Sequence, residues 1–194
     1  MNKDLFKDFK WDAESEIEIK EKTLIIKASP RSDYFVDPAN GKMILNAPYF
    51  HTETTGDFTL KAKVSGLYKS DYDACALMVL SGETCWGKLC FELTDLGTHA
   101  VVSVVTNGVS DDANGVDIQG KSVYLQIAKK GKLFAFHYSL DGNEYKMVRY
   151  FTLPVKESFK LGFVAQSPLG EGGDRHFEDI QLNYDSPKNL RNGN

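Results

Sequence analysis

The stretch WGKLCFE, residues 86–92, brings together side chains that could bind or act on a polar ligand. Side chains alternate between the two faces of a β-strand, so one face of such a strand would carry Trp86, Lys88, Cys90 and Glu92. An indole can stack on the apolar side of a sugar ring, while Lys88 and Glu92 can donate to and accept from hydroxyl groups. A solvated strand face is the alternative, and there a Lys–Glu pair contributes under about 1 kcal/mol. Alternation by itself leaves both readings open.

Glycoside hydrolysis is the most demanding chemistry that Glu92 could perform. It needs two carboxylates, about 5 Å apart for retention of configuration and farther apart for inversion. The neighbours of Glu92 on the same strand face are Cys90 and Lys88, so the second acid has to come from another segment. Candidates for it are Asp33, Asp73 and Asp111. Glu92 is the candidate catalytic acid or base, and burial near Trp86 would raise its pKa. Whether the protein is an enzyme stays open.

The bulk composition limits the partners of the chain. It has 194 residues, a formal net charge of −4 and a pI of about 5.6, which argues against binding of nucleic acid or of an anionic membrane. The three cysteines form no C-x-x-C pair, and the four histidines are scattered, so no zinc spacing is present. The N-terminal residues lack the apolar region of a signal peptide. We therefore expect no metal, no cofactor and a cytoplasmic protein with reduced thiols.

Short alternating or apolar runs, separated by Gly, Asn and Asp, predict many strands and almost no helix. A polar break at Lys20–Lys22 separates the first two runs, and the apolar run Ala74–Leu80 predicts a central strand buried on both faces. The predicted strands cover residues 17–19, 23–28, 58–64, 74–80, 86–93, 100–106, 123–129, 132–139, 147–151, 159–165 and 177–184. The fold class is therefore all-β, an antiparallel two-sheet β-sandwich in one domain over residues 1–185. The polar tail at residues 186–194 is expected to fray.

An ordered set of short motifs extends from Asp33 to Leu182. The set consists of Asp33-Tyr34-Phe35, Asp57-Phe58, Ala76–Val79, Trp86-x-Lys88 with Glu92, Val104–Thr106 with Ser110-Asp111, Tyr138-Ser139-x-Asp141-Gly142 with Arg149, and Gln166-Ser167-Pro168 with Gly170 and Phe177. In order and spacing it resembles the concanavalin A-like lectin/glucanase superfamily, and within it the "regulation of enolase" group. Asp112 departs from the pattern, because an aromatic residue is expected after Ser-Asp.

The resemblance implies a jelly-roll sandwich with a concave face, which in the superfamily commonly holds carbohydrate. It brings no settled activity for this group, although a fungal relative is linked to enolase regulation. It places the strand at residues 86–93 in the middle of a sheet, where its outward face lines the groove or is covered by a loop. The Glu-x-Asp-x-x-Glu arrangement of the superfamily's glucanases and the metal loop of legume lectins are both absent. A lone Ca²⁺ held by loop oxygens stays open.

The groove that the resemblance implies gives roles to further polar residues. Ser110 and Asp111 follow a turn at Asn107-Gly108, so they either satisfy turn amides or overhang the groove. Arg149 lies among apolar neighbours and must be paired, with Glu92 or Asp111 as partner or with an anionic ligand. The predicted ligand-binding residues are Trp86, Lys88, Glu92, Asp33, Tyr34, Ser110, Asp111, Arg149 and Gln166.

These observations predict an intracellular carbohydrate-binding or sugar-responsive β-sandwich protein with a ligand groove on the concave face. An enzyme that acts on a sugar or sugar acid through Glu92 is the first alternative. A protein-interaction or regulatory module, similar to an enolase regulator, is the second. The exposed edges of the sheets leave a homodimer open as well.

Overall fold

The computed structural model describes residues 5–20 and 23–194, which form sixteen strands and no helix. Accordingly, these residues contain no helix that is long and apolar enough to cross a bilayer. Residues 1–4 and 21–22 lie outside the description, and with them most of the polar break expected at residues 20–22. The predicted all-β fold class is confirmed.

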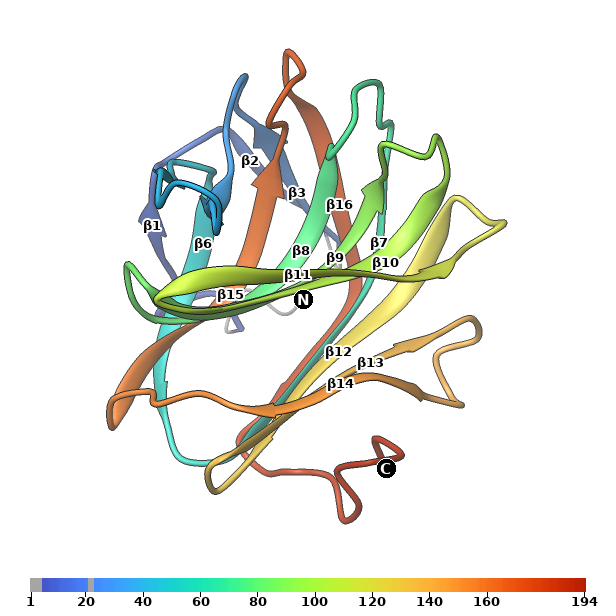
Figure 1. Cartoon of the computed structure of the whole chain (residues 1–194). Helices are drawn as coiled ribbons and strands as arrows, with labels where there is room; N and C mark the ends of the chain where they lie inside the picture. The colour runs from blue at the N-terminus through green and yellow to red at the C-terminus, as the bar shows by residue number, and fades with distance from the viewer. Residues whose placement is uncertain (1–4, 21–22) are drawn as a thin grey trace.

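The strands form two seven-stranded antiparallel sheets (Figure 1). In spatial order, the first sheet consists of β1 (Lys10–Asp12), β6 (Tyr49–Thr55), β15 (Ser158–Gln166), β8 (Ala74–Gly82), β9 (Cys85–Leu93), β10 (His99–Asn107) and β11 (Val109–Asp117). The second consists of β14 (Lys146–Thr152), β13 (Leu133–Ser139), β12 (Ser122–Lys130), β7 (Phe58–Gly66), β16 (Gly173–Asn183), β3 (Thr23–Ala28) and β2 (Ile17–Lys20). A separate hairpin is formed by β4 (Tyr34–Val36) and β5 (Met43–Leu45).

The main core lies between the two sheets and follows the period of two that the sequence predicts. On β7, Leu60, Ala62 and Val64 are buried in this core, whereas Lys61 and Lys63 are less buried on the other face. The first sheet contributes alternate residues to the same core, among them Leu77 and Leu89. Strand alternation therefore accounts for how the two sheets bury their apolar faces against each other.

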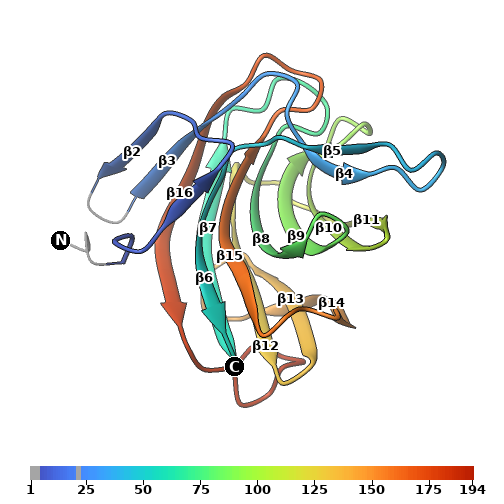
Figure 2. The same ribbon diagram turned by 90° about the vertical axis from the view of Figure 1, so that its left-hand side faces the viewer.

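The hairpin β4–β5 covers part of the outer face of the first sheet (Figure 2). Tyr34 and Val36 pack there in a second apolar cluster that includes Met78, Trp86 and Cys90. This cover explains why β8 is buried on both faces, as its continuous apolar run predicts. The outer face of the first sheet is thus partly a second core, with cavities where the hairpin leaves it uncovered.

Strand β11, which carries two of the predicted ligand-binding residues, was not predicted as a strand. Ser110 and Asp111 were expected in a loop, but they lie on β11, an edge strand whose sequence VSDDANGVD is mostly polar. Edge strands need few apolar residues because solvent covers one side, so periodicity detects them poorly.

The C-terminal tail does not fray as expected. It folds back onto the outer face of β12 and β13, where Leu190 is buried in a small apolar cluster with Ala128 and Ala135. His137 Nε2 donates to the Leu190 carbonyl over 2.9 Å, and Gln126 Nε2 donates to the Gly193 carbonyl over 3.2 Å. A single leucine and two buried polar anchors therefore hold a segment whose composition is otherwise polar.

Candidate functional site

A cavity of about 280 Å³ lies between the β4–β5 hairpin and strands β9 to β11. We call it the Lys88 cavity. Most of its polar lining comes from the outer face of the first sheet and from the start of β4. It is lined by Asp33, Phe35, Tyr72, Lys88, Glu92, Val104, Asp112 and Gln166.

Strand register explains why these side chains meet. Ala74 lies opposite both Glu92 on β9 and Gln166 on β15, so two long polar side chains flank one small residue. In another row across the sheet, Lys88 faces Val104, which in turn faces Asp112. Residues directly opposite each other share a sheet face, so the small Ala74 leaves open space above the sheet between longer neighbours.

Lys88 is the central cation of the cavity and is only 2 % exposed. Its Nζ lies 2.9 Å from Asp33 Oδ1 and donates to Gln166 Oε1 over 2.8 Å. Burial alone would lower the pKa of Lys88, but the nearby Asp33 carboxylate outweighs burial and raises it. Lys88 therefore stays charged and holds the start of the hairpin against the sheet.

Gln166 is fixed from behind by a buried ion pair. Its Nε2 donates to the Tyr72 backbone carbonyl over 3.1 Å, and the backbone carbonyl of Gln166 accepts from Arg175 Nη2 over 3.1 Å. Arg175 Nη2 also lies 3.3 Å from Asp73 Oδ1, and both side chains are almost completely buried. Asp73, one of the expected second acids, is thus already paired and supports the cavity instead of facing a ligand.

Glu92 and Asp112 are the carboxylates of the cavity that form no ion pair with a cation among the described residues. Glu92 is 6 % exposed, and burial together with the charges of Asp112 and Asp33 raises its pKa to about 8, although Lys88 opposes the shift. Asp112 forms the exposed rim on β11, and partial loss of water raises its pKa too. The expectation of a raised pKa at Glu92 is confirmed, and Glu92 can donate a hydrogen bond at neutral pH.

Tyr72 forms an aromatic rim that sequence reasoning missed. Its side chain is 37 % exposed and its backbone adopts a left-handed conformation with φ of 69°. This conformation is unfavourable for a bulky residue and clusters at functional sites. It directs the Tyr72 carbonyl at Gln166 while the Tyr72 amide donates to the Leu93 carbonyl over 2.7 Å. The pattern Asp71-Tyr72-Asp73 before an apolar strand was the available signal.

The stacking role expected for Trp86 does not fit the structure. Its indole is completely buried under the β4–β5 hairpin, and Nε1 donates to the Glu83 carbonyl over 3.1 Å. Its neighbour on the same strand face, Lys88, faces the cavity, so the expected ligand-facing strand is covered at one end and open at the other. The aromatic groups that can meet a ligand are Tyr72 and Phe35 instead.

The other expected ligand-binding residues lie outside the Lys88 cavity. Ser110 Oγ accepts from the Val36 amide over 2.9 Å and so fastens the hairpin to β11. Arg149 Nη2 lies 2.7 Å from Asp111 Oδ1 in a partly exposed ion pair, which resolves the open question of the arginine's partner. Tyr34 points to the opposite side of the hairpin from Asp33 and Phe35, because side chains alternate along β4.

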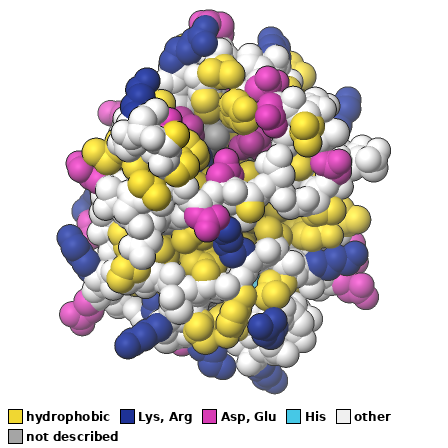
Figure 3. Space-filling view, viewed as in Figure 1, with side chains coloured by type: hydrophobic (Ala, Val, Ile, Leu, Met, Phe, Trp, Pro, Cys, Tyr) yellow, Lys and Arg dark blue, Asp and Glu magenta, His cyan; other side chains and the backbone are white. Residues whose placement is uncertain are grey.

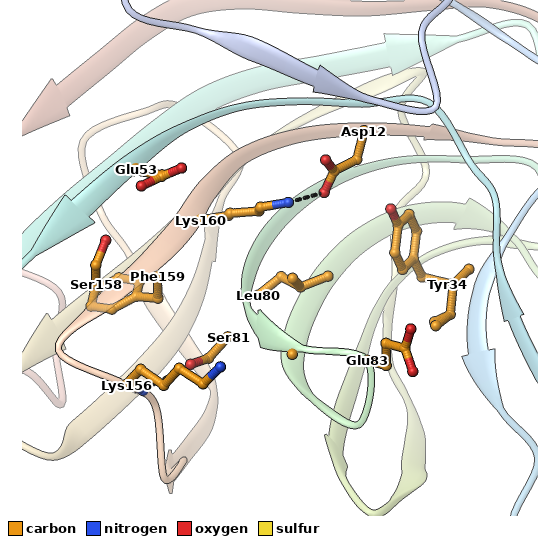
Figure 4. A pocket seen from close by; sticks show the side chains of 12 residues that line it. Asp12, Tyr34, Glu53, Leu80, Ser81, Glu83, Lys156, Ser158, Phe159 and Lys160 are labelled. Atoms are coloured by element: carbon orange, nitrogen blue, oxygen red, sulfur yellow. Dashed lines mark hydrogen bonds and ion pairs between the residues drawn. The ribbon is translucent and has the colours of Figure 1, made fainter.

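A second cavity, of about 540 Å³, lies on that opposite side (Figure 4). We call it the Lys160 cavity. Lys160 forms an ion pair with Asp12 across it, and the Tyr34 hydroxyl points into it from the hairpin. His51 Nε2 lies 3.4 Å from Asp12 Oδ1, and burial lowers the pKa of His51. The remaining acidic residues of the Lys160 cavity, Glu53 and Glu83, are exposed to solvent.

Neither cavity offers a preformed metal site within the described residues. No group of three His, Cys, Asp or Glu side chains in residues 5–20 and 23–194 is arranged to hold a metal ion.

The fold and the covered sheet face define a two-sheet β-sandwich protein with two cavities beside a hairpin. The family model described as "Protein of unknown function (DUF1349)" matches residues 11–184, so the chain belongs to that family. The chain is 25 % identical over 158 residues to "Regulation of enolase protein 1" from Saccharomyces cerevisiae, covering 81 % of this chain and 79 % of the yeast protein. The resemblance to the regulation of enolase group is thus confirmed.

Two solved structures confirm the sandwich fold. A functionally unknown protein from Saccharomyces cerevisiae has a TM-score of 0.85 at 23 % identity, over 95 % of this chain and 99 % of that one. The carbohydrate binding module CBM66 from Bacillus subtilis has a TM-score of 0.60 at 10 % identity, over 91 % of this chain and 96 % of the module. At these identities, the structural matches establish the fold alone.

Proposed function

We propose that the Lys88 cavity binds one sugar unit, either a free monosaccharide or the end of a glycan. The observation that carries this proposal is the fixed set of Lys88, Asp33 and Gln166 inside a cavity with an aromatic rim. Sugar sites combine positioned hydrogen-bonding groups with an aromatic surface for the apolar side of the ring.

The volume and the chemistry of the cavity support a small hydroxylated ligand. About 280 Å³ is near the lower end of the range for small-molecule sites, which suits a single ring. Asp33 offers acceptor positions, and protonated Glu92 can donate to a hydroxyl. Because Gln166 is held by Tyr72 and Arg175, these groups are positioned before the ligand arrives.

The fold of CBM66 supports the proposal by showing that a similar sandwich occurs in a protein named as a carbohydrate binding module. A cytoplasmic location, a protein partner and a homodimer remain predictions from the sequence.

Saturation-transfer difference NMR with a panel of hexoses and pentoses tests the proposal. Tyr72→Asn removes the ring while keeping a residue that tolerates a positive φ, and Tyr184→Asn is the matched control at an exposed tyrosine. We expect at least one sugar to bind, with affinity reduced about tenfold by Tyr72→Asn and unchanged by Tyr184→Asn. Absence of binding to any sugar, or equal binding by Tyr72→Asn, would contradict the proposal.

Hydrolysis of a glycosidic bond is the second candidate, and the raised pKa of Glu92 favours it. A carboxyl group that is protonated at neutral pH can act as a general acid, and Asp112 supplies a second carboxylate at the same cavity. Release of nitrophenol from a panel of nitrophenyl glycosides is the assay. Hydrolysis that Glu92→Gln abolishes supports the enzyme, whereas turnover that survives this substitution excludes the role of Glu92.

A further inference from the structure

The Lys88 cavity contains more carboxylates than cations. Asp33, Glu92 and Asp112 face it, together with the single ammonium group of Lys88. The hydrogen bonds of Lys88 go to Asp33 and Gln166, so neither Glu92 nor Asp112 has a hydrogen-bonded or ion-paired side chain among the described residues. Arg149 does not supply one, since its guanidinium binds Asp111 outside the cavity.

Burial of Glu92 makes the excess of carboxylates energetically unfavourable. Its side chain is more than nine-tenths buried and lines the cavity without a partner, and a buried unpaired carboxylate is unfavourable when ionised. Without a ligand, the Glu92 carboxyl group keeps its proton at neutral pH, as its raised pKa indicates. A cation delivered by a ligand would let Glu92 ionise inside the cavity and form a charge-assisted hydrogen bond.

We infer that the Lys88 cavity prefers a ligand with a protonated amine, such as an amino sugar, over the neutral and acidic forms of the same ring. The inference rests on the proposed function for the ring and adds the charge of its substituent. An acidic sugar would face the Asp112 carboxylate as a like charge and would keep Glu92 protonated, whereas an ammonium group would be attracted to Asp112 and would favour ionisation of Glu92. A neutral hydroxyl group would leave the excess of carboxylates over cations in the cavity unchanged.

The surface around the Lys88 cavity carries acidic side chains, so its charge has the same sign as that of the carboxylates in the cavity. On the face in Figure 3, acidic side chains gather in the upper middle, whereas most Lys and Arg side chains lie toward the outline. In the same view of Figure 1, this region is above β11, the strand that carries Asp112. A bare metal ion fits less well than an amine, since the described residues contain no triad of acids, histidines or cysteines arranged to hold one.

Isothermal titration calorimetry of the full chain tests the inference with three matched sugars, namely D-glucosamine, D-glucose and D-glucuronate, and with the corresponding galactose series. The titrations run at a pH at which the amine is protonated. We expect the amino sugar to bind about tenfold more tightly than the neutral sugar, and the uronate to bind most weakly. Asp112→Asn should reduce the amine's advantage to about threefold or less, because it removes one of the two charges.

Asp117→Asn, on the same strand but outside the cavity, is the control and should keep the full preference. Equal affinity for neutral and amino sugars would overturn the inference and leave the proposed function standing. Cyclohexylamine and cyclohexanol separate the two ideas further. If cyclohexylamine binds, cyclohexanol does not and no sugar binds, the amine preference survives and the sugar proposal fails. Loss of amine binding on addition of CaCl₂, with saturable calcium binding, would overturn the inference in favour of a metal site.

Discussion

The β4–β5 hairpin divides the outer face of the first sheet into two cavities of different character. The Lys88 cavity is the smaller one, and its charged groups include an almost fully buried lysine and a buried, unpaired Glu92. The Lys160 cavity is nearly twice as large, yet Lys160 and Asp12 pair with each other and the remaining acids are exposed. The smaller cavity therefore contains the buried, unpaired charge, and the larger one does not.

The two cavities differ in how much free energy a ligand can gain by contacting their charged groups. Exposed, mutually paired charges already interact with water and with each other, so a ligand gains little by replacing these contacts. A largely buried carboxylate without a partner has little of either contact, so a suitable ligand gains more. Four kinds of substitution test whether this contrast between the cavities holds.

The largest effect is expected at Trp86, the buried ring on which the dividing hairpin rests. Trp86→Ala leaves a void under Tyr34 and removes the bond to Glu83, so the free energy of unfolding should fall by about 3–5 kcal/mol. Leu80→Ala, at the partly exposed wall of the Lys160 cavity, should cost about 1 kcal/mol or less. Urea unfolding of both variants measures the difference. Near-equal losses would show that the hairpin does not depend on Trp86.

Lysine substitutions compare the two cavities directly. Lys88→Met leaves the Asp33 carboxylate without its partner, which should cost about 3–5 kcal/mol of unfolding free energy. Lys160→Met breaks a partly exposed pair and should cost about 1 kcal/mol or less. Chemical denaturation checks both values. A mild effect at Lys88 would contradict the assignment of its ion pair as buried and structural.

Glu92→Gln should change how stability depends on pH. The unfolded chain releases the Glu92 proton near pH 4.5, whereas the folded protein holds it up to about pH 8. The folded state therefore binds more protons in this window, and the wild-type free energy of unfolding falls as pH rises through it. Lys88 opposes the shift, whereas Asp112, Asp33 and Asp95 reinforce it.

Glutamine cannot ionise, so the free energy of unfolding of Glu92→Gln should not show this fall. Relative to the wild type, it should rise by on the order of 2 kcal/mol as the pH increases from one end of this window to the other. Urea unfolding at a series of pH values measures the gain. Glu83→Gln, at the exposed rim of the Lys160 cavity, is the control and should follow the wild type. Parallel curves for wild type and Glu92→Gln would show that Glu92 is not held in its protonated form.

The smallest effect is expected at the surface pair of Asp111 and Arg149. Asp111→Asn should reduce the free energy of unfolding by less than about 1 kcal/mol, because the Asp111 carboxylate is largely solvated. It should also leave sugar binding unchanged, since the pair lies outside the Lys88 cavity. Loss of binding in this variant would restore the role that the sequence suggested for Asp111.

The sequence predicts the parts of the site that depend on strand alternation. WGKLCFE does form a central strand, and Lys88 and Glu92 do share its outer face, because the period of two is local information. The position of the hairpin over Trp86 could not be predicted from strand patterns, since the short run Tyr34-Phe35-Val36 does not reveal which distant surface it covers. Asp112 enters the cavity through the pairing of β10 with β11, and the polar sequence of β11 gives no strand signal.

If the proposed function is right, a sugar binds on one side of the β4–β5 hairpin and not on the other. A ¹H–¹⁵N NMR titration of the full chain with D-glucosamine and with D-glucose tests it most directly. We expect saturable shifts of the amides of Tyr72, Val104 and Gln166 around the Lys88 cavity, and none at Glu53 or Ser158 beside the Lys160 cavity. Shifts confined to the Lys160 cavity, or no saturable shift with either sugar, would contradict it.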